Sequence, residues 1–504
     1  MRWFNVVILL IGILTSTCGF VNAQKRNAIW CFGDSAGIDF NNLSFPTSIA
    51  TAMDSRGSCC SISDTSGALL FYASGSDPLQ SPLSELVIVR NALNQMIQNG
   101  DSIIGQIWYQ ELTITDLPTN QNLFYLFSTG VTANYGLYYS VIDMNANGGL
   151  GMVLQKNVQL ESFKCSDGVT ALKHANGRDW WIIIRNWDNV NNKFYKYLIS
   201  SVGVSNAIVQ NIGSMTNNGF GKMKFSKDGS KMAFITFIGL LEVYDFDRCT
   251  GNLSNTITLH PEPLSSPYPN RFISCEFSSN GQVLYVNTSS NNSTLYQYDL
   301  NQPNPALSRI VLDSIPNSLI GMGFLKLAPD DKIYFSMAYE CLIAPYCYPY
   351  PDSVYNYVNM NLSVIKYPDS LGTACDYDPF SFFLGGKRTY YALPNNPDYD
   401  MPALAGSPCD TLVGIGDVPQ IQQAALNVFY HSAWEKAFIN ASNLKGKTGK
   451  LLVYDLQGKV IHSEPLRIHN GYYTKDLSMT VYETGVYIVT IHTEGERLAK
   501  KLTK

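Results

Sequence analysis

The side chains that most often perform catalysis are few in this sequence of 504 residues. The first 395 residues contain two histidines, His174 and His260, and no HExxH, GxSxG or phosphate-binding motif in a supporting context. Paired carboxylates such as Asp245 and Asp247 fall where strands should end, whereas a glycosidase needs two carboxylates that face one substrate bond. The sequence therefore predicts no catalytic residue and favours a non-enzymatic role.

Cysteine usage points to disulfide bonds and not to metal binding. The sequence has 11 cysteines, but it lacks paired CxxC motifs and has only 6 histidines, so we expect no metal site and no cofactor. If Cys18 is removed with a signal peptide, an even number remains, which permits disulfides after export. The short loop between Cys341 and Cys347 is the most local candidate pair. The adjacent Cys59 and Cys60 are equally compatible with buried free thiols.

Aromatic side chains offer a second kind of chemistry, which is ligand contact. Residues 339–357 are rich in tyrosine and proline, and tyrosine rings on a stiffened loop present amphipathic surface to sugars or proteins. A tryptophan cluster lies near residue 187. We expect ligand contact from these aromatic residues: Tyr339, Tyr346, Tyr348, Tyr350 and Trp187. The alternative is packing between neighbouring sheets, which we favour for Trp180 and Trp181.

A repeated hairpin must position these side chains. Four copies of an apolar strand, a turn and a second apolar strand align at His174, Ser226, Ser278 and Ala328, with spacings of 52, 52 and 50 residues. The turns contain Asn-Gly, Asp-Gly or Asp-Asp, which tolerate the positive φ of a tight turn. Four strands in about 50 residues is the size of one propeller blade. The period does not fit two stacked β-sandwiches.

The length of the repeat region sets the expected number of blades. Residues 24–395 divided by the 52-residue period give close to seven units. The fold class is therefore predicted as all-β, with a seven-bladed β-propeller followed by a small C-terminal β-sandwich. Six or eight blades stay open, because the first and last repeats are degenerate. We expect a strand near residues 29–32 to complete the last blade and close the ring.

The N-terminus indicates export. Residues 1–23 combine Arg2, an apolar run at residues 6–13 and a small-residue cleavage site at Ala23, as a secretory signal peptide does. The apolar run is shorter than the roughly 20 residues that span a bilayer, so we expect no transmembrane segment in the mature chain. A net charge of -5 argues against nucleic-acid binding.

Several segments resemble exported WD-repeat-like β-propellers of Bacteroidota. They are residues 30–40, 60–72, 223–234 and 362–365, together with Cys375 and residues 392–395. The resemblance implies a propeller at residues 24–395 with an undefined ligand and no catalytic residues. A stretch containing Pro, Asp and Gly follows, and residues 396–426 are predicted to form a linker.

Residues 427–504 resemble the type A C-terminal sorting domain of type IX secretion cargo. The similarity lies in the turn at residues 455–459, the strand at residues 484–491 and the lysine-rich end, whereas the usual Pro-Asn-Pro near the start is replaced by residues 430–432. The resemblance implies the type IX secretion machinery as a partner. It also implies a sorting signal that includes Gly485, Tyr487, Lys500, Lys501 and Lys504.

Together these patterns predict a protein that crosses the periplasm and is secreted or held at the outer-membrane surface. We expect a binding or adhesion propeller whose ligand is a glycan or a protein. One alternative is an extracellular polysaccharide hydrolase or lyase on the same scaffold. Another is a structural component of the adhesion or gliding machinery.

Overall fold

The computed structural model describes residues 25–75, 86–105, 110–118, 120–131, 135–187, 190, 192–216, 219–261, 272–288, 293–316, 320–339, 354–410 and 423–504. The predicted signal peptide at residues 1–23 lies outside these ranges and stays a prediction. Among the described residues, no helix has the length and apolarity needed to cross a bilayer. The described helices are three short 3-10 turns: η1 (Asn147–Gly149), η2 (Pro305–Ser308) and η3 (Gly372–Cys375).

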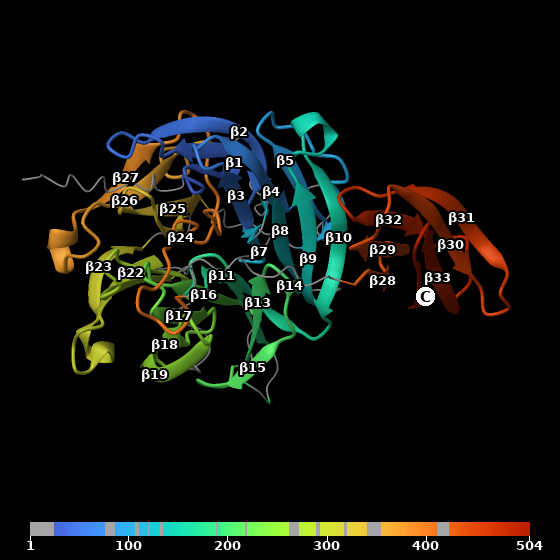
Figure 1. Ribbon diagram of the computed structural model, residues 1–504. Helices are drawn as coiled ribbons and strands as arrows, with labels where there is room; N and C mark the ends of the chain where they lie inside the picture. The colour runs from blue at the N-terminus through green and yellow to red at the C-terminus, as the bar shows by residue number, and fades with distance from the viewer. Residues whose placement is uncertain are drawn as a thin grey trace, which may run out of the picture.

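Seven antiparallel sheets precede residue 384 and lie around a common centre (Figure 1). The first contains only β1 (Ile29–Asp39) and β2 (Thr47–Ser55). The other six follow one another along the chain. Their strands are β3 (Cys59–Ser63), β4 (Leu69–Gly75), β5 (Leu86–Asn91) and β6 (Ile103–Ile104); β7 (Leu112–Leu117), β8 (Asn120–Gly130), β9 (Gly136–Asp143) and β10 (Met152–Glu161); β11 (Cys165–Lys173), β12 (Trp180–Asn186), β13 (Lys193–Ser200), β14 (Gly203–Val204) and β15 (Ile208–Asn211); β16 (Gly221–Phe225), β17 (Lys231–Thr236), β18 (Leu241–Asp247) and β19 (Asn252–His260); β20 (Phe272–Phe277), β21 (Val283–Thr288), β22 (Ser293–Asp299) and β23 (Ile310–Ile315); and β24 (Ile320–Leu327), β25 (Ile333–Tyr339), β26 (Asn361–Ile365) and β27 (Tyr377–Phe383).

The predicted hairpin turn is confirmed in all four clear repeats. The amide three residues after each turn residue donates to that residue's carbonyl oxygen, for example Gly229 to Ser226 at 2.8 Å and Gly281 to Ser278 at 3.0 Å. The donor residue is left-handed each time, with φ of 73° at Gly229 and 61° at Asp331. Glycine and aspartate tolerate this conformation, so the local sequence alone specifies the turn.

The first strand of each larger sheet lies toward the centre of the ring. β3 contacts β7, β7 contacts β11, and the contacts continue through β16 and β20 to β24. Gly168 in β11 shows how close these strands come, because a Cβ atom there would lie 2.5 Å from the carbonyl oxygen of Gly221 in β16. The inner strands of neighbouring sheets therefore lie close together around the centre of the ring, and some of their side chains line a central channel.

The ring closes differently from the sequence prediction. β1 pairs with β2, whereas β24 to β27 supply all four strands of the last sheet from residues 320–383. The backbone amide of Asp34 in β1 donates to the carbonyl oxygen of Arg388 at 2.9 Å. The backbone amide of Phe324 in β24 donates to the carbonyl oxygen of Tyr391 at 2.8 Å. Residues 388–393 thus run between the last sheet and β1. Because the first sheet has two strands, the number of seven blades stays a prediction.

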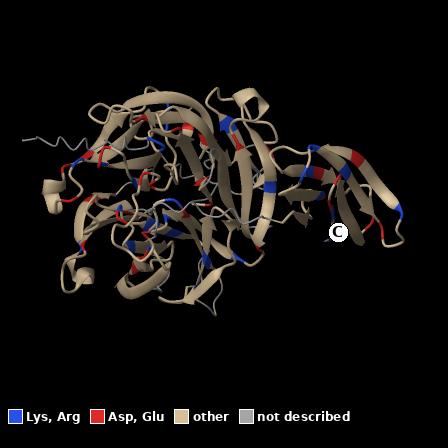
Figure 2. Cartoon of the chain, in the orientation of Figure 1, with Lys and Arg blue, Asp and Glu red and all other residues tan. Residues whose placement is uncertain are grey.

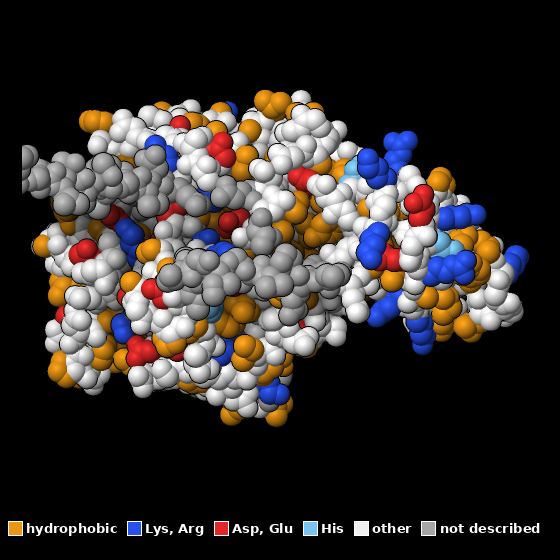
Figure 3. Space-filling model, in the orientation of Figure 1, with side chains coloured by type: hydrophobic (Ala, Val, Ile, Leu, Met, Phe, Trp, Pro, Cys, Tyr) orange, Lys and Arg blue, Asp and Glu red, His pale blue; other side chains and the backbone are white. Residues whose placement is uncertain are grey.

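A separate β-sandwich follows the ring, as predicted (Figure 1). Apolar residues of both layers pack together in its core, among them Ile439, Leu451 and Val489. Basic side chains gather on this sandwich in Figures 2 and 3. Its first layer consists of β28 (Ala425–His431), β29 (Lys436–Ser442) and β32 (Tyr473–Ser478), and its second of β30 (Thr448–Tyr454), β31 (Val460–Arg467), β33 (Val486–Thr493) and β34 (Arg497–Thr503).

Candidate functional site

A cavity of about 790 Å³ lies at the central channel, on the side of the repeated hairpin turns. Its wall includes hydroxyl groups of the inner strands, such as Thr113 and Thr170, and turn residues such as Ser226. Apolar side chains, including Phe40 and Phe225, contribute the rest. The volume and the mixture of apolar surface with a few polar groups are typical of small-molecule sites.

Three ionisable residues in the cavity wall occupy the same position of successive repeats. Lys224 in β16, Glu276 in β20 and Lys326 in β24 each lie two residues before the turn residue. The Lys224 ammonium lies 2.8 Å from a carboxylate oxygen of Glu276, and that oxygen also accepts the backbone amide of Leu327 at 3.1 Å. The repeat therefore places alternating charges around one half of the channel.

Lys326 is the buried lysine of this set. It is 3% exposed, and its ammonium nitrogen donates to the carbonyl oxygen of Asn396 at 3.0 Å. Burial, followed by the positive charge of Lys224, lowers the pKa of Lys326 to about 7. Lys326 thus changes its charge near neutral pH inside the cavity wall.

Residues 395–402, which we name the channel segment, cross the cavity. Asn395 bridges three inner strands. Its side-chain amide nitrogen donates to the carbonyl oxygens of Leu112 at 2.8 Å and Val169 at 2.9 Å. Its backbone amide donates to the carbonyl oxygen of Cys59 at 2.8 Å. Tyr399 is 2% exposed. Most of this segment was predicted as the start of a linker, but in the structure it packs into the channel.

Two carboxyl groups of the channel segment line the same cavity. Burial raises the pKa of Asp398, and the backbone amide of Asp400 donates to it at 2.9 Å. Burial, followed by the charge of Asp398, raises the pKa of Asp400 to about 7. Asp400 is exposed at the cavity surface, so water screens part of this effect. The cavity therefore combines lysines with carboxyl groups that are easily protonated.

A disulfide fixes the chain beyond the channel segment. Cys409 is bonded to Cys249, which lies 160 residues earlier, after β18. Nearby, Arg248 donates to the carbonyl oxygen of Pro402 at 2.7 Å. The pair that we predicted, Cys341 and Cys347, lies outside the described residues. Cys59 and Cys60 are buried free thiols.

The aromatic residues predicted to contact ligand do not line the cavity where they are described. Tyr339 is half-buried at the end of β25 and packs against the core beside it. Trp187 is half-buried, with the Lys164 ammonium 5.7 Å from the centre of its ring. Tyr346, Tyr348 and Tyr350 lie outside the described residues. Trp180 and Trp181 are 0% and 2% exposed and belong to the core, as we expected.

Both ring nitrogens of His174 contact backbone groups. One ring nitrogen accepts the backbone amide of Asn176 at 3.1 Å, and the other lies 3.0 Å from the carbonyl oxygen of Cys249. Within the residues that the structure describes, no group of three His, Cys, Asp or Glu side chains is placed to hold a metal ion.

The residues of the predicted sorting signal lie in the second layer of the sandwich. Tyr487 in β33 is 7% exposed, whereas Lys500 and Lys501 in β34 are exposed. The Lys504 ammonium donates to the carbonyl oxygen of Met479 at 2.8 Å. The backbone amide of Gly485 donates to the carbonyl oxygen of Lys504 at 3.3 Å. The last lysine is therefore tied to the fold, while the two before it face solvent.

The cavity residues were not predicted from the sequence, although the repeats contain a signal for them. Aligning the turn residues also aligns Lys224, Glu276 and Lys326, which are three charged residues at one position of strands that are rich in apolar residues. Charged residues at one repeat position of inner strands must share one environment, which here is the channel. The channel segment gave no comparable signal, because its burial depends on contacts with strands hundreds of residues earlier.

Comparison with solved structures finds distant propeller-like proteins. A putative 6-phosphogluconolactonase from Bacteroides uniformis is 12% identical, with coverage of 64% of this chain and 95% of that chain and a TM-score of 0.39. A quinonprotein alcohol dehydrogenase-like protein from Bacteroides thetaiotaomicron is 12% identical, with coverages of 74% and 79% and a TM-score of 0.40. The β-propeller domain of Myceliophteria thermophila Cps50 is 8% identical, with coverages of 62% and 93% and a TM-score of 0.34. These scores are below 0.5, so the fold description rests on the chain's own sheets.

The C-terminal sandwich has a clear family match. A search of curated proteins found no match to the chain. Residues 434–504 match the family model of the secretion system C-terminal sorting domain, and they include all five residues of the predicted sorting signal. The chain is therefore a β-propeller protein that ends in a type IX C-terminal sorting domain, which directs it to the cell surface or into the medium.

Proposed function

We propose that this protein is an exported binding protein that holds a short, charged oligosaccharide in the central cavity. The observation that carries the proposal is the cavity of about 790 Å³ with ionisable side chains on its wall. Lys224 and Lys326 are hydrogen-bond donors, whereas Glu276, Asp398 and Asp400 offer acceptors. A ligand with both hydroxyl and charged groups matches such a wall better than an apolar ligand does.

The arrangement of the wall supports binding at this position. The inner strands place their charges by the repeat. The channel segment is held by three hydrogen bonds that Asn395 donates and by two that it accepts, from Gln110 and Thr113. A site on rigid elements loses little conformational entropy when it binds a ligand. Phe225, which is half-buried in the cavity wall, supplies apolar surface against which a sugar ring can pack.

The test is a binding screen with the purified mature protein. Neutral, acidic and amino-containing oligosaccharides are arrayed, and hits are measured by calorimetry with the wild type and with Lys224→Met and Glu276→Gln. We expect at least a tenfold loss of affinity in one of these variants. Lys231→Met is the matched control, because Lys231 lies in the same sheet, pairs with Asp245 and does not line the cavity. Equal affinities in all four proteins would contradict the proposal.

The second candidate function is cleavage of an extracellular polysaccharide. It is favoured by the raised pKa values of Asp398 and Asp400 and the lowered pKa of Lys326, because perturbed groups that share a cavity are common in acid-base catalysis. Product analysis by chromatography separates the two functions. Turnover that disappears in Asp400→Asn while binding persists would establish the enzyme; binding without products in the wild type would exclude it for that polysaccharide.

A further inference from the structure

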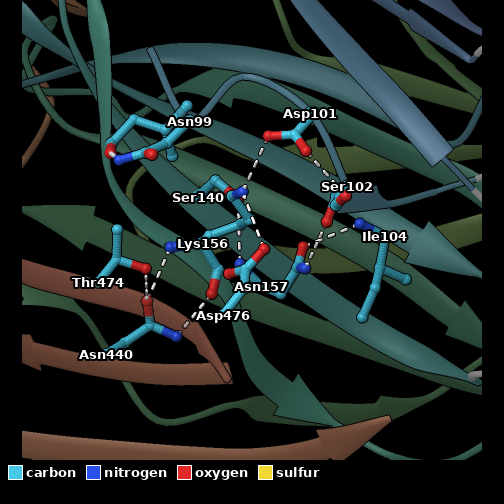
Figure 4. Close-up of polar contacts among 11 residues, drawn as sticks. Asn99, Asp101, Ser102, Ile104, Ser140, Lys156, Asn157, Asn440, Thr474 and Asp476 are labelled. Carbon is cyan, nitrogen blue, oxygen red and sulfur yellow. Dashed lines mark hydrogen bonds and ion pairs between the residues drawn. The ribbon is translucent and has the colours of Figure 1, made fainter. Parts of the chain in front are cut away.

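The sorting domain contacts the propeller at the outer edge of one sheet. β10 is the last strand in the order β10-β9-β8-β7, so one of its sides pairs with β9. Its other side is an edge that forms an isolated bridge with Gln98 at Met152 and pairs with no described strand of its own sheet. β28, β29 and β32, the three strands of the first sandwich layer, contact β10 (Figures 1 and 4). An uncovered strand edge presents free backbone groups that attract other strands.

Asn440 of β29 pairs with the backbone of this edge. Its carboxamide oxygen accepts the backbone amide of Lys156 at 2.8 Å, and its nitrogen donates to the carbonyl oxygen of Lys156 at 2.5 Å (Figure 4). The Thr474 hydroxyl donates to the same carboxamide oxygen at 2.8 Å, and Asn440 is 1% exposed. One side chain therefore takes the place of a neighbouring strand at this residue of β10.

The side chain of Lys156 joins the two parts by charge. Its ammonium nitrogen lies 3.3 Å from a carboxylate oxygen of Asp476 in the sorting domain and 3.4 Å from one of Asp101 in the propeller (Figure 4). The side chain of Lys156 is only 3% exposed. An ion pair that is buried at a junction is screened less by water and salt than a surface pair, so the contact with Asp476 favours the docked arrangement.

Further contacts flank this pair. Asn470 donates to a carboxylate oxygen of Asp143 at 2.5 Å. The rings of Phe429 and Tyr138 lie 5.8 Å apart, and Tyr472 of the sorting domain packs against a core cluster of the propeller. The junction therefore combines backbone pairing, a buried charge and apolar contact.

We propose that β10 is a docking surface for the sorting domain of the same chain, and that it holds this domain in one orientation on the folded propeller. Lys156 lies in an irregular part of the β9–β10 pairing, where the register shifts between Gln155 and Val158 and Asn157 has a φ of 57°. Asn440 can pair with its backbone only when this sheet is folded. A chain in which this sheet is unfolded cannot form the dock. The first sandwich layer is held against the propeller, and Lys500 and Lys501, in the second layer, face solvent.

Hydrogen exchange of the full mature protein tests this dock. Asn440→Ala removes the backbone pairing, and Lys156→Met removes the charge from the propeller side, outside the sorting domain. We expect amides in the peptide at residues 152–161 to exchange at least tenfold faster in Asn440→Ala. We expect amides in β29 and β32 to exchange at least threefold faster in Lys156→Met. Lys450→Met, an exposed lysine of β30 in the other layer, should leave both regions unchanged.

The readout separates undocking from unfolding. Peptides from β30 and β33 report on the fold of the sorting domain, and an undocked but folded domain keeps their wild-type exchange. Small-angle scattering should then give a larger radius of gyration for Asn440→Ala than for Lys450→Met. Wild-type exchange of β10 in Asn440→Ala, or of β29 and β32 in Lys156→Met, would overturn the proposal.

Discussion

The buried ammonium group of Lys326 should make stability depend on pH in a predictable direction. Its pKa is lowered from 10.5 to about 7, first by burial and then by Lys224. Between these two values the unfolded chain binds more protons than the folded chain, so the contribution of Lys326 becomes more favourable as pH rises. From pH 7 to pH 9 this change amounts to about 2 kcal/mol in the free energy of unfolding.

The measurement compares the wild type with Lys326→Met, which keeps the aliphatic volume and cannot titrate. Urea unfolding is followed by tryptophan fluorescence at pH 7, 8 and 9, and the difference between the two proteins isolates Lys326 from all other titrating groups. We expect the wild type to gain about 2 kcal/mol relative to the variant over this range. Lys231→Met serves as the control, because Lys231 is half-buried and pairs with Asp245 outside the cavity. A difference between wild type and Lys326→Met that is the same at all three pH values would refute the reasoning.

Other changes test the channel segment and the sorting signal. Cys249→Ser opens a loop of 160 residues and should lower the free energy of unfolding by about 4 kcal/mol, measured against the oxidised wild type; an unchanged denaturation midpoint would contradict the disulfide. Asn395→Ala removes the side-chain bonds to Leu112 and Val169 and should cost about 1–3 kcal/mol, with faster hydrogen exchange at the start of β7 and β11; unchanged exchange there would exclude the bridging role. Deletion of residues 500–504 should retain the protein in the periplasm, as cell fractionation and surface proteolysis would detect; wild-type amounts on the surface or in the medium would show that these residues are not needed for sorting.

The repeated hairpin could be predicted from the sequence because its causes are local. The turns at Ser226 and Ser278 need a residue that tolerates positive φ, and Gly229 and Gly281 supply it at a fixed spacing. The flanking strands carry β-branched and aromatic residues that favour extended backbone. The same argument fails at the ring closure, because the pairing of β1 depends on which distant edge it meets and not on its own composition.

The candidate site could be predicted only in part. Lys224, Glu276 and Lys326 share a repeat position, so an alignment of the repeats brings them together once the channel is recognised. The disulfide between Cys249 and Cys409 could not be predicted, because spacing does not determine connectivity among ten cysteines. The channel segment has the composition of a linker, and its burial depends on the acceptors that β7 and β11 present to Asn395.

The channel segment links export to the completed cavity. Asp398 and Asp400 lie between the inner-strand contacts of Asn395 and the disulfide at Cys409, so both ends of this stretch are fixed by parts of the ring. Disulfides form in oxidising compartments and are rare in the cytoplasm. The chain carries a sorting domain that sends it out of the cell. The disulfide that fixes the end of this stretch therefore forms along the export route, after the chain has left the cytoplasm.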